Sequence, residues 1–240
     1  MPFLLTTISG LSTLIGTFLI FIKIKNKNNI ISSSCSFAAG VMLCISICDL
    51  IPESFKYLRI FKPYKIIFIS FMFLLLGIII SYIIDKYIDK YNNSNLYKVG
   101  ILSMIVIILH NIPEGIITYL ISTKSIKLGI SLCLAISLHN IPEGISISVP
   151  IYYSTKSKKI AFLYTFISAL SEPFGAFISY IFLSKYINDI MLGILFNIIA
   201  GIMIQIGINN LFPLSKKYNK KLSYIFFLIG FLIMILSLII

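Results

Sequence analysis

The sequence predicts an all-α polytopic membrane protein with eight transmembrane helices. Hydrophobic residues make up 58% of its 240 positions and charged residues only 12%, whereas an average soluble domain has about 25% charged residues. The mean hydropathy is +1.01. A helix needs about 20 apolar residues to cross the roughly 30 Å hydrocarbon core of a bilayer. Eight stretches have this length, at approximately residues 3–22, 31–54, 66–84, 99–122, 128–151, 160–184, 190–212 and 222–240.

Lysine and arginine residues set the predicted orientation of the chain. The connections after the first, third, fifth and seventh stretches hold 13 of the 20 Lys and Arg residues, and the other three hold 7. Because such residues concentrate in cytoplasmic loops, we place these four connections in the cytoplasm and both termini on the extracytoplasmic side. The net charge of +12 then reflects contact with the lipid bilayer and not with nucleic acid. We expect one integral membrane domain over residues 1–240, in the cell membrane (plasma or inner).

The first three stretches differ in their polar residues. The first places small and hydroxylated residues along one stripe, which we interpret as a packing face, with a polar pathway as the alternative. The second ends in DLIPES, in which Asp49 and Glu53 are four residues apart and form either a solvated helix end or part of an access path. The third, like the eighth, has almost no polar stripe, so it would face lipid or a second subunit. A polar connection, Asp85 to Lys98, follows the third stretch.

The fourth and fifth stretches carry the most informative motif. His-Asn-Ile-Pro-Glu-Gly occurs twice, at His110 to Gly115 and at His139 to Gly144, and it contains both histidines of the chain. The 29-residue spacing predicts an antiparallel helical hairpin with both copies near the middle of the membrane. Ionisable groups at that depth are costly and usually mark a functional site.

The spacing within each motif brings unlike ligands together. In a helix, His110 and Glu114 share a face, and Asn111 points in an adjacent direction. The second copy repeats this arrangement with His139, Glu143 and Asn140. The proline in each motif removes an amide hydrogen, so we also expect a kink in each helix.

Glu172 in the sixth stretch adds a third carboxylate at a similar depth. It is the only charged residue between Lys159 and Lys185. Two imidazoles, three carboxylates and two amides form a set that suits Zn²⁺, Fe²⁺ or Mn²⁺ and is too rich in nitrogen for Mg²⁺ or Ca²⁺. A polar packing contact would explain one such residue alone, but five ionisable residues in three stretches favour a metal site. Whether one or two ions bind stays open.

The two HNIPEG motifs, SEPFGA at Ser171 to Ala176 and DLIPES at Asp49 to Ser54 resemble the ZIP family of divalent metal transporters, in particular its ZupT-like bacterial branch. The resemblance covers essentially the whole chain. It implies a homodimer that imports divalent transition metal towards the cytoplasm by moving a ligand-bearing bundle against a scaffold. It also implies a metal site made of His110, Asn111, Glu114, His139, Asn140, Glu143 and Glu172.

Two departures from this family concern the cytoplasmic side. Many relatives have a histidine-rich loop after the third helix, whereas the connection from Asp85 to Lys98 contains no histidine. Relatives also commonly carry an acidic pair near the inner end of the seventh helix, where this chain has Asn209 and Asn210. If these amides line the release path, they should hold a cation less strongly than carboxylates would.

We therefore predict a transporter and not an enzyme. Its cargo would be zinc first, with iron or manganese also carried, and no prosthetic group is expected. The alternative is a membrane metalloenzyme in which the same His and Glu cluster activates water or holds two irons. The sequence argues against this alternative because it has no HExxH motif and no substrate-binding domain outside the membrane stretches.

Overall fold

The computed structural model describes residues 1–22, 26–89, 95–183 and 188–239, and these residues form helices and connecting turns without any strand. Eight of its helical segments are long and apolar enough to cross a membrane, which confirms the predicted fold class. These spans are Pro2–Phe21, Lys27–Tyr57, Pro63–Tyr87, Leu96–Lys124, Ile126–Thr155, Lys158–Ile181, Asp189–Tyr218 and Lys220–Leu238. The predicted ends at residues 184 and 240 lie outside the described residues.

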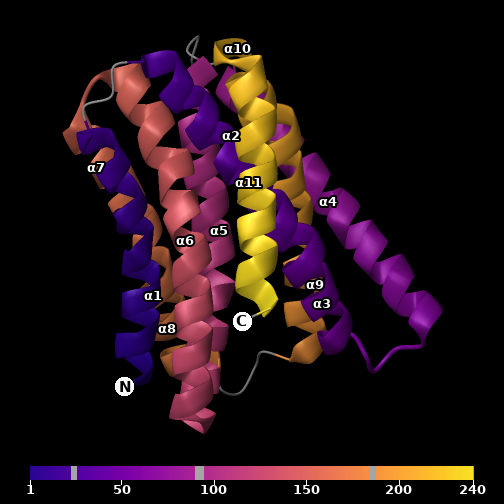
Figure 1. Cartoon of the computed structure of the whole chain (residues 1–240). Coiled ribbons are helices and arrows are strands. Elements are labelled where there is room, and N and C mark those ends of the chain that lie inside the picture. The colour runs from indigo at the N-terminus through magenta and orange to yellow at the C-terminus, as the bar shows by residue number, and fades with distance from the viewer. Residues whose placement is uncertain (23–25, 90–94, 184–187, 240) are drawn as a thin grey trace.

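Several spans are made of more than one helical piece (Figure 1). The first is α1 (Pro2–Thr17) with a 3₁₀ turn (Phe18–Phe21), and the second is α2 (Lys27–Ile45), a π-helical turn (Ser46–Leu50) and α3 (Ile51–Tyr57). The next three are single helices: α4 (Pro63–Asp89), α5 (Asn95–Lys124) and α6 (Ile126–Thr155). The sixth is α7 (Lys158–Ala169), α8 (Ser171–Ile178) and a π-helical turn (Ser179–Leu183). The seventh is α9 (Asp189–Ile206), a π-helical turn (Gly207–Leu211) and α10 (Phe212–Tyr218), and the eighth is α11 (Lys220–Ile239).

Short polar residues define where several helices begin. The side chains of Asn26, Ser125, Ser157 and Asn188 each accept a hydrogen bond from a backbone amide in the first turn of the following helix. Such capping satisfies backbone donors that have no partner within the helix. These caps separate apolar stretches that hydropathy alone would leave nearly continuous, above all α5 and α6, which are joined at Ser125.

A π-helical turn occurs at each of the two predicted pathway pairs, Asp49 with Glu53 and Asn209 with Asn210. In the second span a π-helical turn contains Asp49, and Pro52 follows in the next helical piece. The seventh span repeats this order, with Asn209 and Asn210 in the π-helical turn and Pro213 after it. By contrast, α5 and α6 continue as α-helices past the prolines of the HNIPEG motifs, so the kinks expected there do not end either helix.

The helices form two bundles (Figure 1). We call α1, α5, α6, α7 and α8 the ligand bundle, because it holds both HNIPEG motifs and Glu172. We call α2, α3, α4, α9, α10 and α11 the flanking bundle. Most helix contacts lie within one bundle, and α2 with α6 and α5 with α9 form the main contacts between them.

Glycine pairs bring helices of the same bundle into backbone contact. An added Cβ at Gly115 would strike the backbone of Glu172 in α8, and one at Gly144 would strike Thr13 in α1. Gly40 with Phe227 and Gly77 with Ile198 make equivalent contacts in the flanking bundle. Small residues permit this close approach in membrane helices. For the described glycines, the close contacts lie within a bundle or a single hairpin, and none joins the ligand bundle to the flanking bundle.

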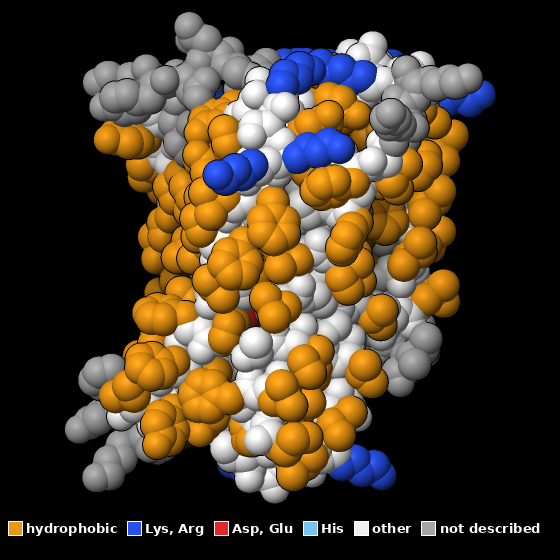
Figure 2. All heavy atoms as spheres, turned by 90° about the vertical axis from the view of Figure 1, so that its left-hand side faces the viewer, with side chains coloured by type: hydrophobic (Ala, Val, Ile, Leu, Met, Phe, Trp, Pro, Cys, Tyr) orange, Lys and Arg blue, Asp and Glu red, His pale blue; other side chains and the backbone are white. Residues whose placement is uncertain are grey.

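The outer surface has the polarity expected of a membrane protein. Figure 2 shows apolar side chains over most of one face, with the blue Lys and Arg side chains gathered mainly at one end. Exposed residues of α1 on the lipid-facing side include Leu4, Ile8, Leu11 and Ile15. The chain is therefore a multi-pass integral membrane protein.

The connection predicted from Asp85 to Lys98 is shorter than expected. Helix α4 continues to Asp89 and α5 starts at Asn95, so Asp85 and Lys98 both lie in helices. Residues 90–94 lie outside the described part of the chain. Hydropathy missed the helix ends because a helix can extend beyond the hydrocarbon region when charged residues face the interface.

Candidate metal site

The two HNIPEG motifs meet where α5 and α6 pack as an antiparallel hairpin. Glu114 Oε1 lies 3.0 Å from His110 Nε2 on its own helix and 3.0 Å from His139 Nε2 on the other. The two imidazole rings are 6.1 Å apart between centroids. Ligand atoms of His110, Glu114 and His139 all lie within 4.8 Å of one another. Among the described residues, this is the one group of three His, Cys, Asp or Glu side chains that could hold a metal ion.

Glu143 and Asn111 complete the pattern of the repeat but have few partners. Glu143 Oε1 is 3.7 Å from His110 Nε2, which is too long for a hydrogen bond. Within the described chain, both carboxylate oxygens of Glu143 and both amide atoms of Asn111 lack a hydrogen-bond partner. Both residues are completely buried. An unpartnered buried polar group costs about 1–3 kcal/mol, and more when it is charged, so this arrangement is unfavourable unless a ligand binds there.

Glu172 reaches the site from the start of α8 and is held by neutral donors. The Ser9 hydroxyl of α1 donates to its Oε1, and the Asn140 amide donates to its Oε2 over 2.9 Å. The same amide donates to the Ser9 carbonyl over 2.8 Å. Asn140 therefore links Glu172 to both α1 and α6, and all three side chains are completely buried. The structure thus groups His110, Glu114 and His139 from α5 and α6, and it joins Asn140 of α6 to Glu172 of α8, with α1 as an unforeseen further element.

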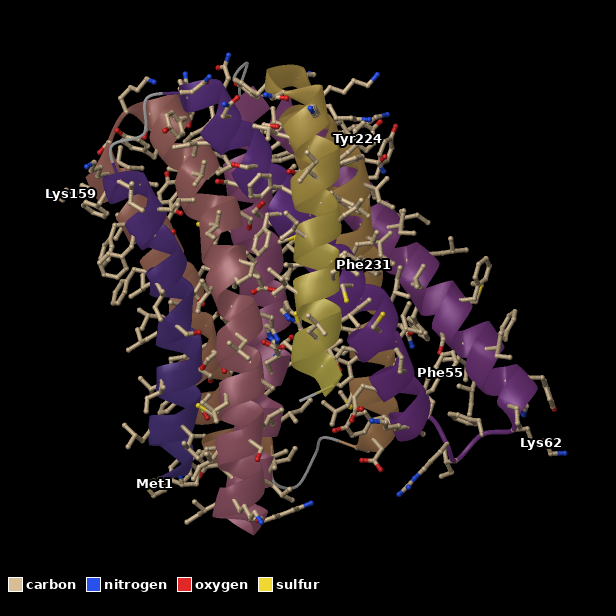
Figure 3. The ribbon with its side chains drawn as sticks, in the orientation of Figure 1. Met1, Phe55, Lys62, Lys159, Tyr224 and Phe231 are labelled. Atoms are coloured by element: carbon tan, nitrogen blue, oxygen red, sulfur yellow. The ribbon has the colours of Figure 1, made fainter. Side chains whose placement is uncertain are left out.

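A cavity of about 230 Å³ adjoins the site and is lined by residues of both bundles. Glu114 and His139 line its inner part, and Asp49, Glu53 and Tyr57 line it towards the end of α3. Residues of α9 and α11 also contribute, so the cavity lies between the two bundles. Figure 3 shows that Phe55 of α3 and Lys62 lie towards the same end as Met1, whereas Lys159 lies at the opposite end. The predicted access pair is therefore on the side of the N-terminus.

The other predicted pathway pair lies at the opposite end, beside α10 (Figure 1). Asn210 donates a hydrogen bond to Asp85 Oδ1 over 2.8 Å, and Lys98 Nζ lies 2.8 Å from the same oxygen. Asn209 is exposed and lines a small cavity with Asp85 and Lys98. An acidic residue therefore does lie beside these amides. It is Asp85 of α4, and not a residue of the seventh span.

Sequence reasoning missed Ser9 and Asp85. Ser9 belongs to the polar stripe that we interpreted as packing, and the stripe itself was the signal that could have identified it. We had assigned Asp85 to a connection between helices. An acidic residue in a connection does not indicate which other helices it contacts. Both residues form hydrogen bonds to helices that are distant in the sequence. Periodicity within one helix does not predict such contacts.

Eight apolar helices around a buried cluster of nitrogen and oxygen atoms define a polytopic membrane protein with a candidate metal site. The chain belongs to the ZIP family, because residues 92–238 match the family model described as ZIP Zinc transporter. This confirms the resemblance predicted from the HNIPEG, SEPFGA and DLIPES motifs.

Relatives from several bacteria support the same assignment over nearly the full length. The chain is 37% identical to zinc transporter ZupT of Clostridium perfringens, with 99% of this chain and 95% of the relative covered. It is 36% identical to ZupT of Streptococcus mutans, with 98% and 96% covered, and 35% identical to ZupT of Campylobacter jejuni, with 98% and 94% covered. Because these names describe transport and no enzymatic reaction, they agree with the prediction that the chain is not an enzyme.

Proposed function

We propose that this protein imports Zn²⁺ across the cell membrane towards the cytoplasm, with Fe²⁺ and Mn²⁺ as further cargo. The transported ion binds His110, Glu114 and His139, together with Glu143, Asn111, Asn140 and Glu172. The observation that carries this proposal is the buried group of two histidines and Glu114, whose ligand atoms lie within 4.8 Å of one another. Mixed imidazole and carboxylate ligands suit these ions, and their charge would offset the burial of three carboxylates.

The cavity supports a route from the extracytoplasmic side. It leads from Asp49 and Glu53 to Glu114 and His139, so an arriving cation meets acidic groups along the way. Beyond the site, towards the other end, apolar side chains of both bundles pack closely. Met42 and Met203 of the flanking bundle belong to one buried cluster with Ile107 and Ile147 of the ligand bundle. We infer that this core closes the path on that side, as expected of a state open to the outside.

The two bundles support a mechanism of alternating exposure. The close glycine contacts lie within bundles, and the cavity follows the boundary between them. The ligand bundle can therefore move as a body against the flanking bundle without separating the helices that hold the ion. We propose that this movement transfers the ion past the apolar core to the cytoplasmic end. The mostly exposed apolar helices α4 and α11 offer the surface for a homodimer.

Uptake into liposomes tests this function directly. The purified full chain is reconstituted, and initial uptake of Zn²⁺, Fe²⁺, Mn²⁺ and Mg²⁺ is measured over a concentration series. We expect saturable uptake of the three transition ions, with Zn²⁺ highest in apparent affinity, and none of Mg²⁺. Tight metal binding without flux would contradict transport and support the metalloenzyme alternative. Flux that does not saturate would indicate a channel.

The acidic pair of the cavity has a separate expected effect. The double variant Asp49→Asn, Glu53→Gln removes the negative charge near the opening but leaves the ligands intact. Because the pair raises the local cation concentration, we expect a KM for Zn²⁺ raised about tenfold with little change in maximal rate. The effect should shrink at high ionic strength, since salt screens exposed charges. A fall in maximal rate at unchanged KM would show that the pair does not serve access.

His139→Gln is expected to change the preference among metals. The substitution replaces an imidazole nitrogen with an amide oxygen, and oxygen ligands suit Mn²⁺ better than Zn²⁺. We expect the ratio of Zn²⁺ to Mn²⁺ transport to fall severalfold while some uptake remains. Competition between the two ions in the liposome assay measures this ratio. An unchanged ratio would exclude His139 as a ligand of the transported ion.

A further inference from the structure

The orientation of the Asn140 amide follows from its surroundings. Its Nδ2 lies 2.8 Å from the Ser9 carbonyl oxygen and 2.9 Å from Glu172 Oε2. Both neighbours are acceptors, so the opposite orientation would place the amide oxygen against a carbonyl and a carboxylate. The two amide hydrogens are thus donated to the Ser9 carbonyl and to Glu172. Asn140 Oδ1 remains, buried and without a hydrogen-bond partner among the described residues.

Ser9 also fixes the Glu172 carboxylate. The Ser9 hydroxyl lies 3.1 Å from the Thr6 carbonyl oxygen and closer to Glu172 Oε1. Its single proton favours the carboxylate, because a hydrogen bond to a charged acceptor is stronger than one to a neutral carbonyl. The two carboxylate oxygens of Glu172 therefore each accept one neutral donor. Each oxygen keeps a free lone pair, since an ionised carboxylate has about four acceptor positions. Glu172 is held in one direction and remains able to coordinate a cation.

We propose that Ser9 is a positioning residue for metal binding. Its hydroxyl orients Glu172. Its carbonyl accepts the Asn140 amide nitrogen, so that Asn140 Oδ1, and not the nitrogen, faces the metal ion. Ser9 itself does not touch the ion. The proposal rests on the proposed function, because it assigns to α1 a role in the affinity of the same site. Polar partners of metal ligands commonly contribute about 10–100-fold to metal affinity.

Three variants test this role by measuring the Zn²⁺ dissociation constant of the purified chain in competition with a chromophoric chelator. Ser9→Ala removes the hydroxyl and is expected to weaken Zn²⁺ binding about tenfold. Ser9→Thr keeps the hydroxyl and should retain most of the affinity. Thr13→Val is the matched control, because among the described residues the buried Thr13 hydroxyl bonds only the Gly10 carbonyl of its own helix. This variant should bind Zn²⁺ as the wild type does.

A fourth variant separates positioning from added charge. Asn140→Asp gives the site another carboxylate, which by charge alone would tighten Zn²⁺ binding. It also removes both donors and sets acceptors against Glu172 and the Ser9 carbonyl. Our proposal therefore expects weaker binding. Thermal unfolding of the purified protein shows whether Ser9→Ala is folded. If it is not, Asn140→Asp still tests the proposal.

The outcomes distinguish a failure of the role proposed for Ser9 from a failure of the proposed function. Ser9→Ala with an affinity within about twofold of the wild type, or Thr13→Val with the same loss as Ser9→Ala, overturns the role of Ser9. Tighter binding by Asn140→Asp overturns the orientation assigned to the amide. If the wild type neither binds Zn²⁺ nor transports it, the proposed function itself is wrong, and the role of Ser9 falls with it.

Discussion

Glu114→Ala is expected to abolish saturable Zn²⁺ uptake while folded protein remains in the membrane. Glu114 is the side chain that both histidines contact, at 3.0 Å from each. Its removal leaves two imidazoles without the carboxylate between them. Because loss of an outer partner of a metal ligand already costs about 10–100-fold in affinity, loss of a shared ligand should cost more than about 100-fold. Glu143→Ala is expected to have the same result.

The liposome assay and a direct binding measurement check this prediction together. Thermal unfolding of each variant shows that the protein is folded. Asp189→Ala is the matched control, since it removes a carboxylate that is exposed at the start of α9 and distant from the ligands in sequence. This control should transport as the wild type does. Full uptake by either Glu114→Ala or Glu143→Ala would exclude a shared site.

Gly115→Ala is expected to damage the site through the backbone and not through a ligand. An added Cβ would collide with the carbonyl group of Glu172 in α8, and neither backbone can move without separating the two helices. Overpacking of this kind typically costs about 1–3 kcal/mol of stability. It also shifts Glu172 relative to the ligands on α5 and α6. We therefore expect a lower unfolding temperature and a loss of most Zn²⁺ uptake from a single added methyl group.

Gly207→Ala provides the comparison for this substitution. Its added Cβ would meet only the Ala39 carbonyl oxygen at 3.5 Å, which is an ordinary contact. The two variants make the same chemical change in the same protein. Equal unfolding temperatures for Gly115→Ala and Gly207→Ala would contradict the close contact between α5 and α8. Uptake and unfolding are measured on the same preparations.

The sequence predicted the eight spans and drew attention to the buried His and Glu residues, for a physical reason. A helix in a bilayer must satisfy its backbone internally and bury apolar side chains in lipid, so hydropathy and length determine the eight spans. Ionisable residues at that depth are rare, and His110, Glu114, His139 and Glu143 were conspicuous against an apolar background. Their four-residue spacing then predicted which of them share a helix face.

The neighbours of these helices were not predictable in the same way. Lipid and helix interior are equally apolar, so hydropathy does not determine which spans pack together. The contacts of Gly115 with α8 and of Ser9 with Glu172 depend on backbone approach between distant segments. The grouping of α1 with α5, α6 and α8 therefore emerges only from the structure. The same reason explains why the partnership of Asp85 with Asn210 was missed.

The Lys98 and Asp85 ion pair would give the proposed movement of the two bundles an energetic bias towards the state described here. It joins α5 of the ligand bundle to α4 of the flanking bundle, at the end away from the cavity. We expect the proposed movement to separate the two side chains and to hydrate both groups. Only 12% and 17% of the two side chains are exposed, so the net energy of the pair depends on the balance between their attraction and the cost of taking both charges out of water. Because salt screens partly buried pairs much less than exposed ones, we expect this bias to persist when the ionic strength is raised.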